Sequence, residues 1–473
     1  MRTGAGNPQD AVSPTAVSAQ AASTDGCLPA GFVFGTAGSA YQIEGGARIG
    51  GRTPSMWDAF GALAGRIADG STADVAVDHY HRWESDLDLL ADLGVAAYRM
   101  SLSWSRIQPH GVGRSNPEGL AFYDRMIDGL LERGIAPFVA LHHWDLPLEL
   151  MERGGWLTRD TVDAFAEYTA VAAGTLGDRV SAWTTLNEPL IPTAYGHAVG
   201  IDAPGLTLLG GAFQAAHHQL LAHGRAVQVL RAGVRGSVGI INHHTTVAPA
   251  TGSTADAVAA RFYDAYHNRQ FTDPLLLGKY PTAVTTMPGA QADIIHDGDM
   301  ALISAPLDFY GVCYAHPTVI AAVPGNASIP FSLELLAGAP LTAADWPIHP
   351  QSLTDLLVEL RRRYPALPPV YVTGIGGAFD DHPEGIAQPD MDRIDYLDRH
   401  LDAVAAAIIL GCDVRGYFHW SLLDSWEWAE GFTRRFGLVR VDPDTLARQP
   451  RASFAHYRDL IRRHRTARSG TAR

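Results

Sequence analysis

The chain has 473 residues, of which 47% are hydrophobic, 18% charged and 9% aromatic. This composition is typical of a folded globular protein and excludes the disordered, collagen-like and coiled-coil classes. The formal charge is −14 and no segment concentrates the 36 basic residues, so we expect neither nucleic acid nor an anionic membrane as a partner. No apolar run reaches the roughly 18 residues that a membrane span requires.

The cysteines and the chain ends carry little functional signal. Cys27, Cys313 and Cys412 are too few and too scattered for a disulfide framework or a metal cluster, so we expect a cytoplasmic protein without metal or cofactor. Residues 1–27 are rich in small and polar residues but lack the apolar run of about 7–15 residues found in secretory signals. They are predicted to be a disordered leader, and residues 466–473 a short tail. The sequence does not indicate an oligomeric state.

From about residue 31, short apolar runs alternate with longer stretches of helical periodicity. This alternation is typical of repeated βα units around a parallel sheet. The clearest helix covers residues 80–94, whose leucines recur at helical spacing and which Gly94 closes. The segments predicted as strands are 31–36, 95–102, 135–142, 181–186, 237–242, 307–312, 369–373 and 414–420.

Eight strands with helical crossovers predict a single (β/α)₈ barrel with long βα loops over residues 28–465. No linker rich in Pro, Gly or Ser divides this region, which argues against two smaller domains. In such barrels the active site lies where the strands end. Polar and aromatic residues gather after the predicted strands: Gln42, Glu44, Arg99, Trp104, His143, Trp144, Asp145, Asn187, Glu188, Asn242, His243, His244, Tyr314, His316, Trp420, Glu427 and Trp428.

This mixture of indole rings, amides and carboxylates suits a carbohydrate better than a phosphate or a metal. Sugar hydroxyls pair with amides and carboxylates, while the C–H face of a sugar ring packs on an aromatic platform. Each residue alone also has a structural explanation. His142 and His143 could form a metal pair, although neighbours on a strand face opposite sides, and the His217-His218 pair fits helix packing. The whole constellation, rather than any single residue, therefore indicates a sugar site.

Five blocks of sequence, in order, resemble the family 1 glycoside hydrolases, the β-glucosidase group. They are FVFGTAGSAYQIEG (32–45), AYRMSLSWSRI (97–107), LHHWDLP (141–147), TLNEP (185–189) and YFHWSLLDSWEWAEGFTRRFGLV (417–439). The resemblance covers nearly the whole chain after the leader. It implies a barrel enzyme that acts on a small-molecule glycoside, or on a sugar donor with an acceptor.

The resemblance also implies roles for individual residues. Glu188 matches the general acid/base, and Asn187 matches the amide that binds the sugar 2-hydroxyl. Trp420 and Phe436 match the platform and wall of the pocket. Glu427 matches a carboxylate that clamps two hydroxyls of the glycone, the sugar ring that is transferred. The candidate sugar-binding residues are Gln42, His143, Trp144, Asn187, Tyr314, Trp420, Glu427, Trp428 and Phe436.

The departures from the family pattern fall at one place. Retaining glycosidases need two carboxyl groups about 5–5.5 Å apart, one as acid/base and one as nucleophile. Where the family reads Thr-Glu-Asn-Gly, this chain has Gly374 in place of the nucleophile and Ile375 in place of the Asn. In the strand at 307–312 and just after it, Cys313 replaces an Asn, and Ala315 replaces the Tyr that bonds the nucleophile.

These changes leave several functions open. We favour single-displacement transfer, in which a hollow at Gly374 receives the leaving group of an α-linked donor and Glu188 acts as base. The alternatives are inverting attack by water in that hollow, slow β-glucosidase activity through another group, and sugar binding without catalysis. Cys313 is one candidate for such a group, whereas the Asp380-Asp381 pair fits loop structure. His419 and Trp426 suggest an altered pocket.

Overall fold

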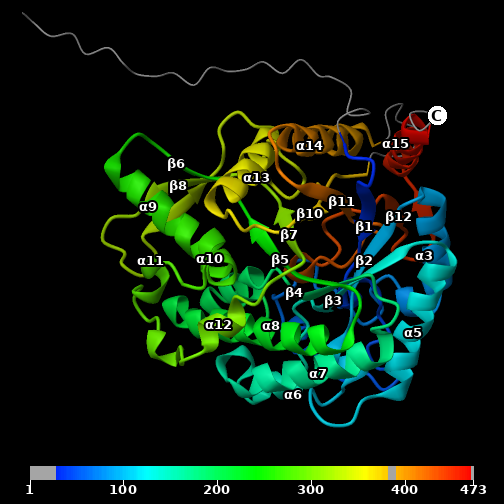
Figure 1. Ribbon diagram of the computed structural model, residues 1–473, viewed down its shortest axis with the longest axis horizontal. Coiled ribbons are helices and arrows are strands. Elements are labelled where there is room, and N and C mark those ends of the chain that lie inside the picture. The colour runs from blue at the N-terminus through cyan, green and yellow to red at the C-terminus, as the bar shows by residue number, and fades with distance from the viewer. Residues whose placement is uncertain (1–27, 382–389, 470–473) are drawn as a thin grey trace, which may run out of the picture.

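The structure is a computed structural model that describes residues 28–381 and 390–469. Its centre is a closed barrel of parallel strands in the order β1-β11-β10-β7-β5-β4-β3-β2, which confirms the predicted (β/α)₈ fold (Figure 1). The barrel strands are β1 (Val33–Ala37), β2 (Ala97–Ser101), β3 (Ala136–His142), β4 (Ala182–Asn187), β5 (Ser237–His244), β7 (Phe309–Tyr314), β10 (Val370–Ile375) and β11 (Val414–Trp420).

Each of these strands overlaps one of the eight segments predicted from the sequence. Three strands, β5, β7 and β10, end two residues further than expected, and β5 therefore includes His243 and His244. The predicted leader lies outside the described residues. The predicted tail, 466–473, begins inside the last helix, which continues to Ser469.

Helices surround the barrel, and Figure 1 shows α3, α5, α7 and α8 lying along its outer side. The predicted helix at 80–94 is α3, and Gly94 ends it in the left-handed conformation (φ 78°) that glycine adopts without strain. The helices are α1 (Ala40–Ile43), α2 (Met56–Gly61), α3 (His79–Leu93), α4 (Trp104–Ile107), α5 (Pro117–Glu132), α6 (Leu148–Glu152), α7 (Asp160–Leu176), α8 (Phe213–Gly233), α9 (Thr254–Asp264), α10 (Gln270–Leu277), α11 (Thr282–Thr285), α12 (Asp299–Ile303), α13 (Gln351–Arg363), α14 (Met391–Ile409) and α15 (Ala452–Ser469).

Two small sheets are built from the long loops. One has the order β6-β8-β9, formed by β6 (Val247–Pro249), β8 (Thr318–Ala322) and β9 (Phe331–Glu334), and α9 packs on it. The other pairs β12 (Val439–Val441) with β13 (Arg448–Pro450). A π-helical turn, η5 (Ala265–Arg269), joins α9 to α10. These elements extend the barrel where the site is expected.

Aromatic side chains pack inside the barrel. The ring of Phe138 lies 5.0 Å from that of Phe418 and 5.6 Å from that of Tyr371, which in turn lies 5.6 Å from the ring of Phe309. These large rings pack against one another inside the sheet, as in other barrels of this size. Ligand chemistry is therefore expected at the carboxyl ends of the strands.

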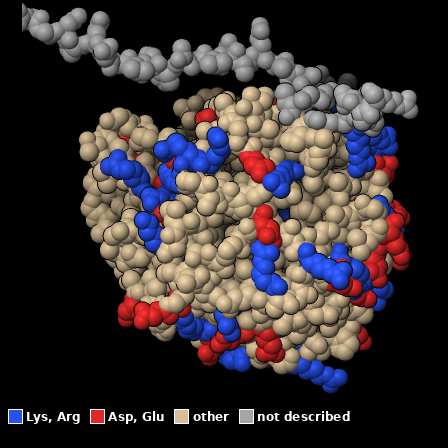
Figure 2. All heavy atoms as spheres, in the orientation of Figure 1, with Lys and Arg blue, Asp and Glu red and all other residues tan. Residues whose placement is uncertain are grey.

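The displayed surface carries charges of both signs. In Figure 2 acidic and basic side chains are interspersed over much of this face. Charged side chains of the described residues also form ion pairs, such as Arg179 with Asp124 and Asp128. Within the described residues, no helix combines the length and apolarity needed to cross a membrane.

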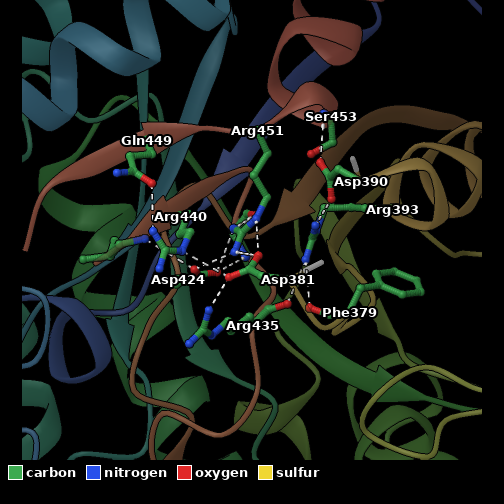
Figure 3. A network of polar contacts seen from close by, with 12 residues as sticks. Phe379, Asp381, Asp390, Arg393, Asp424, Arg435, Arg440, Gln449, Arg451 and Ser453 are labelled. Atoms are coloured by element: carbon green, nitrogen blue, oxygen red, sulfur yellow. Dashed lines mark hydrogen bonds and ion pairs between the residues drawn. The ribbon is translucent and has the colours of Figure 1, made fainter. Parts of the chain in front are cut away.

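An ion-pair network ties the segment after β10 to the segment after β11 (Figure 3). Asp381 accepts hydrogen bonds from Arg435, Arg440 and Arg451, and Arg451 also donates to Asp424 at 2.9 Å. Burial opposes ionisation of Asp381, but its arginine neighbours outweigh burial and lower its pKa. The prediction that Asp381 is part of the loop structure agrees with these contacts.

We expect Arg451→Met to lower the free energy of unfolding by about 3–5 kcal/mol, because it leaves Asp381 and Asp424 short of a buried partner. Urea denaturation followed by circular dichroism measures this loss. The matched control is Arg399→Met, which removes an exposed pair with Asp395 and is expected to change stability by at most about 1 kcal/mol. Equal losses in both variants would contradict the role of the network.

Candidate active site

The acid/base candidate stands at the end of β4, where the backbone is constrained. Glu188 follows the last residue of β4, and its N–H donates to the carbonyl of Ile241 on β5 at 2.8 Å. Its φ of 46° lies in the left-handed region, as do those of Trp144 (76°) and Trp428 (56°). Non-glycine residues adopt this region rarely and at some cost in free energy, and they cluster at functional sites.

The amide of Asn187 organises the groups around Glu188. Its Oδ1 accepts from the guanidinium of Arg99, while its Nδ2 donates to Nε2 of His143 at 3.0 Å and to Oε2 of Glu188 at 2.8 Å. Since Arg99 can only donate, this pattern fixes which end of the amide is oxygen. Burial, reinforced by the charge of Arg99, holds the pKa of His143 well below its usual value. The imidazole is therefore neutral and carries its proton on Nδ1.

Glu188 is suited to proton transfer. Burial raises the pKa of its carboxyl group, while Arg99 and hydrogen bonds from Asn187 and Cys313 partly oppose this effect. A raised pKa brings a carboxyl group closer to neutral pH, where it can both donate and accept a proton.

Indole rings form a cluster beside Asn187. The ring of Trp144 lies 4.6 Å from that of Trp428, which lies 4.8 Å from Trp57 and stacks on Tyr41 at 5.7 Å. The Nε1 of Trp144 donates to the carbonyl oxygen of Asn187 at 2.8 Å. The loops after β1, β3, β4 and β11 therefore meet at one point.

Two residues in this region present polar groups to a ligand. The Nε2 of Gln42 donates to the carbonyl of Trp426 at 3.0 Å, and its buried Oε1 has no hydrogen-bond partner among the described residues. Ser425 donates to Oε1 of Glu427 at 2.6 Å. Burial raises the pKa of Glu427 to about 7, although hydrogen bonds from Ser425 and Gln42 oppose this. An unpaired buried amide oxygen indicates a place where a ligand hydroxyl would bind.

At the nucleophile position, the structure corrects one expectation. Gly374 on β10 lies opposite Cys313 on β7, and a Cβ atom built on Gly374 would be 2.6 Å from Sγ of Cys313. The thiol also lies 3.6 Å from Oγ1 of Thr373. The space beside Gly374 is therefore not the open hollow that was predicted, because Sγ of Cys313 lies against the place where a side chain at position 374 would begin.

The thiol of Cys313 does not fit the role of a nucleophile. Burial raises its pKa far above the usual value, and the nearby charge of Glu188 raises it further. The thiol is therefore protonated at neutral pH, whereas nucleophilic attack requires the thiolate.

Tyr314 is placed differently from the prediction. Its hydroxyl donates to the carbonyl of His349 at 3.3 Å, and its ring lies 6.4 Å from that of His400 on α14. Successive residues of a strand face opposite sides, so Tyr314 points out toward the helices while Cys313 points in. The predicted sugar contact of Tyr314 is corrected.

His419 and Trp426 were predicted to mark an altered pocket, and the structure corrects this prediction for His419. His419 packs 6.2 Å from Tyr457 on α15, on the outer side of the barrel. Trp426 is fully buried in the indole cluster, where its ring lies 5.9 Å from that of Trp57 and its Nε1 donates to Oγ of Ser71 at 3.0 Å. The side chain of His419 therefore does not belong to the group around Glu188.

Phe436 packs beside Trp346, a residue that the sequence did not indicate as part of the site. Its ring lies 5.6 Å from that of Trp346, which lies 6.0 Å from His316. Trp346 stands in the long segment between β9 and α13, far from any predicted strand end. No signal in the sequence separates it from a packing tryptophan.

The closed barrel and the carboxyl, amide and indole groups at its carboxyl end define the chain as a glycosidase-type barrel protein. The Glycosyl hydrolase family 1 profile matches residues 24–466, and the chain belongs to this family. Beta-glucosidase A of Thermotoga maritima is 41% identical over 92% of this chain and 98% of its own length. Thermostable beta-glucosidase B of Thermobispora bispora is 42% identical over 98% and 97%.

Solved structures agree with this assignment. The beta-glucosidase from Thermotoga maritima in complex with deoxynojirimycin superimposes with a TM-score of 0.88 and 40% identity, covering 92% of this chain and 99% of that one. The psychrophilic beta-glucosidase from Micrococcus antarcticus gives a TM-score of 0.90 and 41% identity, over 93% and 99%. The chain is thus a β-glucosidase-like member of the family.

We expect affinity for methyl β-D-glucoside, measured by calorimetry, to fall about eightfold between pH 7.5 and pH 6. Glu427 has a pKa of about 7, so its carboxylate, whose oxygens can accept hydrogen bonds from hydroxyls, becomes protonated in this range. Glu427→Gln should bind more weakly, with a flat pH profile. If Glu427→Gln retained the pH dependence of binding, the titrating group would be a residue other than Glu427.

Proposed function

We propose that this chain acts on a β-glucoside-type sugar by transferring a glycosyl group from an α-linked donor to an acceptor in a single displacement, without a covalent intermediate, so that the β-glucoside is the product. The observation that carries the proposal is the pair at the nucleophile position, where Gly374 offers no side chain and Cys313 offers only a protonated thiol. The proposed sugar-binding residues are Gln42, His143, Trp144, Asn187, Trp420, Glu427, Trp428 and Phe436.

In the proposed transfer the donor is α-linked, and each bond that breaks or forms is accounted for. The bond from the anomeric carbon to the leaving group breaks, and the electron pair departs with the leaving group on the Gly374 side. The acceptor hydroxyl forms the new bond from the Glu188 side, and its proton passes to the Glu188 carboxylate. The products are a β-glycoside and the released leaving group. The leaving group needs the space at Gly374, so the Cys313 side chain must rotate to another staggered conformer.

Arg99 supports this role of Glu188. Its guanidinium is bonded to Asn187, lies 5.4 Å from the ring centre of Trp420, and opposes the effect of burial on the pKa of Glu188. A nearby cation favours the ionised carboxylate, which is the form that acts as a base. No metal or cofactor enters the proposed step.

Hydrolysis of β-glucosides is the second candidate, because the relatives described above are named beta-glucosidases. Retaining hydrolysis would require a carboxylate opposite Glu188, and position 374 has none. Inverting attack by water would require a base on the Gly374 side. A protein that only binds sugar would not need a buried carboxyl group with a raised pKa, such as that of Glu188.

The first test supplies α-glucosyl fluoride as donor and an aryl β-glucoside as acceptor, with products read by NMR. We expect a β-linked product, and a loss of about 10²–10⁴-fold in Glu188→Gln because the base is removed. Glu430→Gln, which alters an exposed carboxylate, is the control. Release of glucose from the aryl β-glucoside in water alone would favour hydrolysis, and no product with any donor would favour a binding protein.

The second test concerns the thiol. We expect azide to accelerate consumption of an aryl β-glucoside at least about tenfold more in Cys313→Ala than in the unaltered protein, giving the α-glucosyl azide. Removing Sγ opens the space beside Gly374 to the anion. Cys412→Ala, which alters the other buried cysteine among the described residues, is the control. An equal response in all three proteins would show that the thiol does not limit access.

Gly374→Glu alone is expected to restore little hydrolysis, because the new Cβ would lie 2.6 Å from Sγ of Cys313. Combining it with Cys313→Asn, the residue in the family pattern, should restore more. Rates with an aryl β-glucoside measure the difference. Full restoration by Gly374→Glu alone would contradict the importance of Cys313.

A further inference from the structure

The guanidinium of Arg99 is a buried cation to which the described residues give no paired carboxylate. Arg99 stands on β2 and is 3% exposed. Its one hydrogen bond within the described part of the chain goes to the amide oxygen of Asn187, which is neutral. Its Nε is buried and has no hydrogen-bond partner there. Burial of a charge is costly unless the charge is paired, so this guanidinium is suited to binding an anion.

The other buried arginines have the partner that Arg99 lacks. Within the described residues the buried arginines are Arg99, Arg106 and Arg393. Arg106 donates to Oε2 of Glu44 at 3.0 Å, and Arg393 is paired with Asp390. Burial by itself therefore does not explain why Arg99 has no carboxylate beside it.

The charge of Arg99 acts on both sides of the proposed reaction. Burial raises the pKa of the Glu188 carboxyl and of the Cys313 thiol, and Arg99 opposes the rise in both groups. Such an effect weakens with distance, so the guanidinium lies near both. Because Sγ of Cys313 lies against Gly374, Arg99 is close to the side from which the leaving group departs.

The Gly374 side gains room when the thiol turns away. Apart from the chain neighbours of Gly374, the only heavy atoms of the described residues within 4 Å of a Cβ built there are Sγ and Cβ of Cys313. Rotation of Cys313 to another staggered conformer therefore opens this position. Ala315, which stands where the family pattern has a Tyr, fills less volume than that Tyr.

Thr373 offers a second hydrogen-bond donor at the same place. The register of β10 against β7 shifts between Val372 and Gly374, which leaves Thr373 out of the pairing. Irregularities of this kind are frequent beside active sites. The buried hydroxyl of Thr373 lies 3.6 Å from Sγ of Cys313. When the thiol rotates, this hydroxyl can donate to a ligand oxygen instead.

We propose that Arg99 and the hydroxyl of Thr373 bind a phosphoryl group on the Gly374 side, so that the leaving group of the donor is phosphate. This inference rests on the proposed transfer function and specifies its donor as an α-glucosyl phosphate. The fork of donors on a guanidinium matches the oxygens of a phosphate. One guanidinium suits a single phosphoryl group better than the diphosphate of a nucleotide sugar.

The step balances with the donor in its monoanionic form. The bond between the anomeric carbon and the phosphate oxygen breaks, and its electron pair leaves with the phosphate as HPO₄²⁻. The acceptor oxygen bonds the anomeric carbon, and its proton passes to the carboxylate of Glu188. In the reverse direction HPO₄²⁻ attacks a β-glucoside, and the protonated Glu188 returns the proton to the departing alcohol.

Binding of inorganic phosphate to the full chain, measured by calorimetry, tests the site without catalysis. We expect Arg99→Met to weaken phosphate at least about tenfold, because it removes hydrogen bonds from a charged group. Arg99→Lys should recover part of the loss, since it keeps the charge. Arg114→Met, which alters an exposed arginine, is the control. Circular dichroism checks that each variant is folded. No phosphate binding by the unaltered protein, or equal binding by folded Arg99→Met, would overturn the proposal.

A second variant locates the phosphate independently of Arg99. Cys313→Ala removes the atom that must turn away, so we expect it to bind phosphate about threefold to tenfold more tightly. Cys412→Ala, which alters the other buried cysteine among the described residues, should bind phosphate as the unaltered protein does. Equal affinities in all three proteins would show that the phosphate does not bind beside Gly374.

Three donors then identify the leaving group: α-D-glucose 1-phosphate, uridine diphosphate glucose and α-glucosyl fluoride, each with an aryl β-glucoside as acceptor and products read by NMR. We expect transfer from glucose 1-phosphate. Arg99→Met should lower kcat/KM for this donor at least about tenfold more than for the fluoride, which has no phosphoryl oxygens to bind. Transfer from the nucleotide sugar but not from glucose 1-phosphate would overturn the assignment of a single phosphate.

The two proposals fail separately in these experiments. Transfer from the fluoride, without phosphate binding and without transfer from glucose 1-phosphate, overturns the phosphate site and leaves the single displacement standing. Phosphate binding that depends on Arg99, without transfer from any of the three donors, overturns the proposed function and leaves the phosphate site standing.

Discussion

Closure of the barrel by pairing of β1 with β11 is the constraint on which the candidate site depends. These strands come from opposite ends of the chain, and their register places Ala37 beside Trp420. The loops that follow them then meet, so that Gln42 bonds the carbonyl of Trp426 at 3.0 Å. Without this closure, the residues implied to clamp the glycone would be separated from one another and from Glu188.

The groups around Glu188 are the basis of the proposed single displacement. Arg99 lies against Asn187, and across from Glu188 stand Gly374 and the uncharged thiol of Cys313. The positive charge that develops at the anomeric carbon in the transition state is then stabilised by a carboxylate on the Glu188 side only. This favours a reaction in which a leaving group on the Gly374 side carries negative charge.

The sequence predicted the fold well because its evidence is periodic and repeated. Eight strands and the helix α3 appear where hydrophobic spacing placed them, and Gly94 ends α3 as expected. Predictions about single side chains at strand ends were less accurate. Tyr314 turns outward and His419 packs behind the barrel, because the direction of one side chain depends on strand phase and on neighbours from other elements.

The sequence by itself determined the barrel and the family, and it places Gly374 where the resemblance implies a nucleophile, because patterns and residue identities are local properties. Only the tertiary structure decided what fills the space beside Gly374 and which group Arg99 contacts. Sγ of Cys313 on β7 lies against Gly374 on β10, and the guanidinium of Arg99 on β2 reaches Asn187 on β4. These contacts join segments far apart in the chain, and only packing of the folded barrel brings them together.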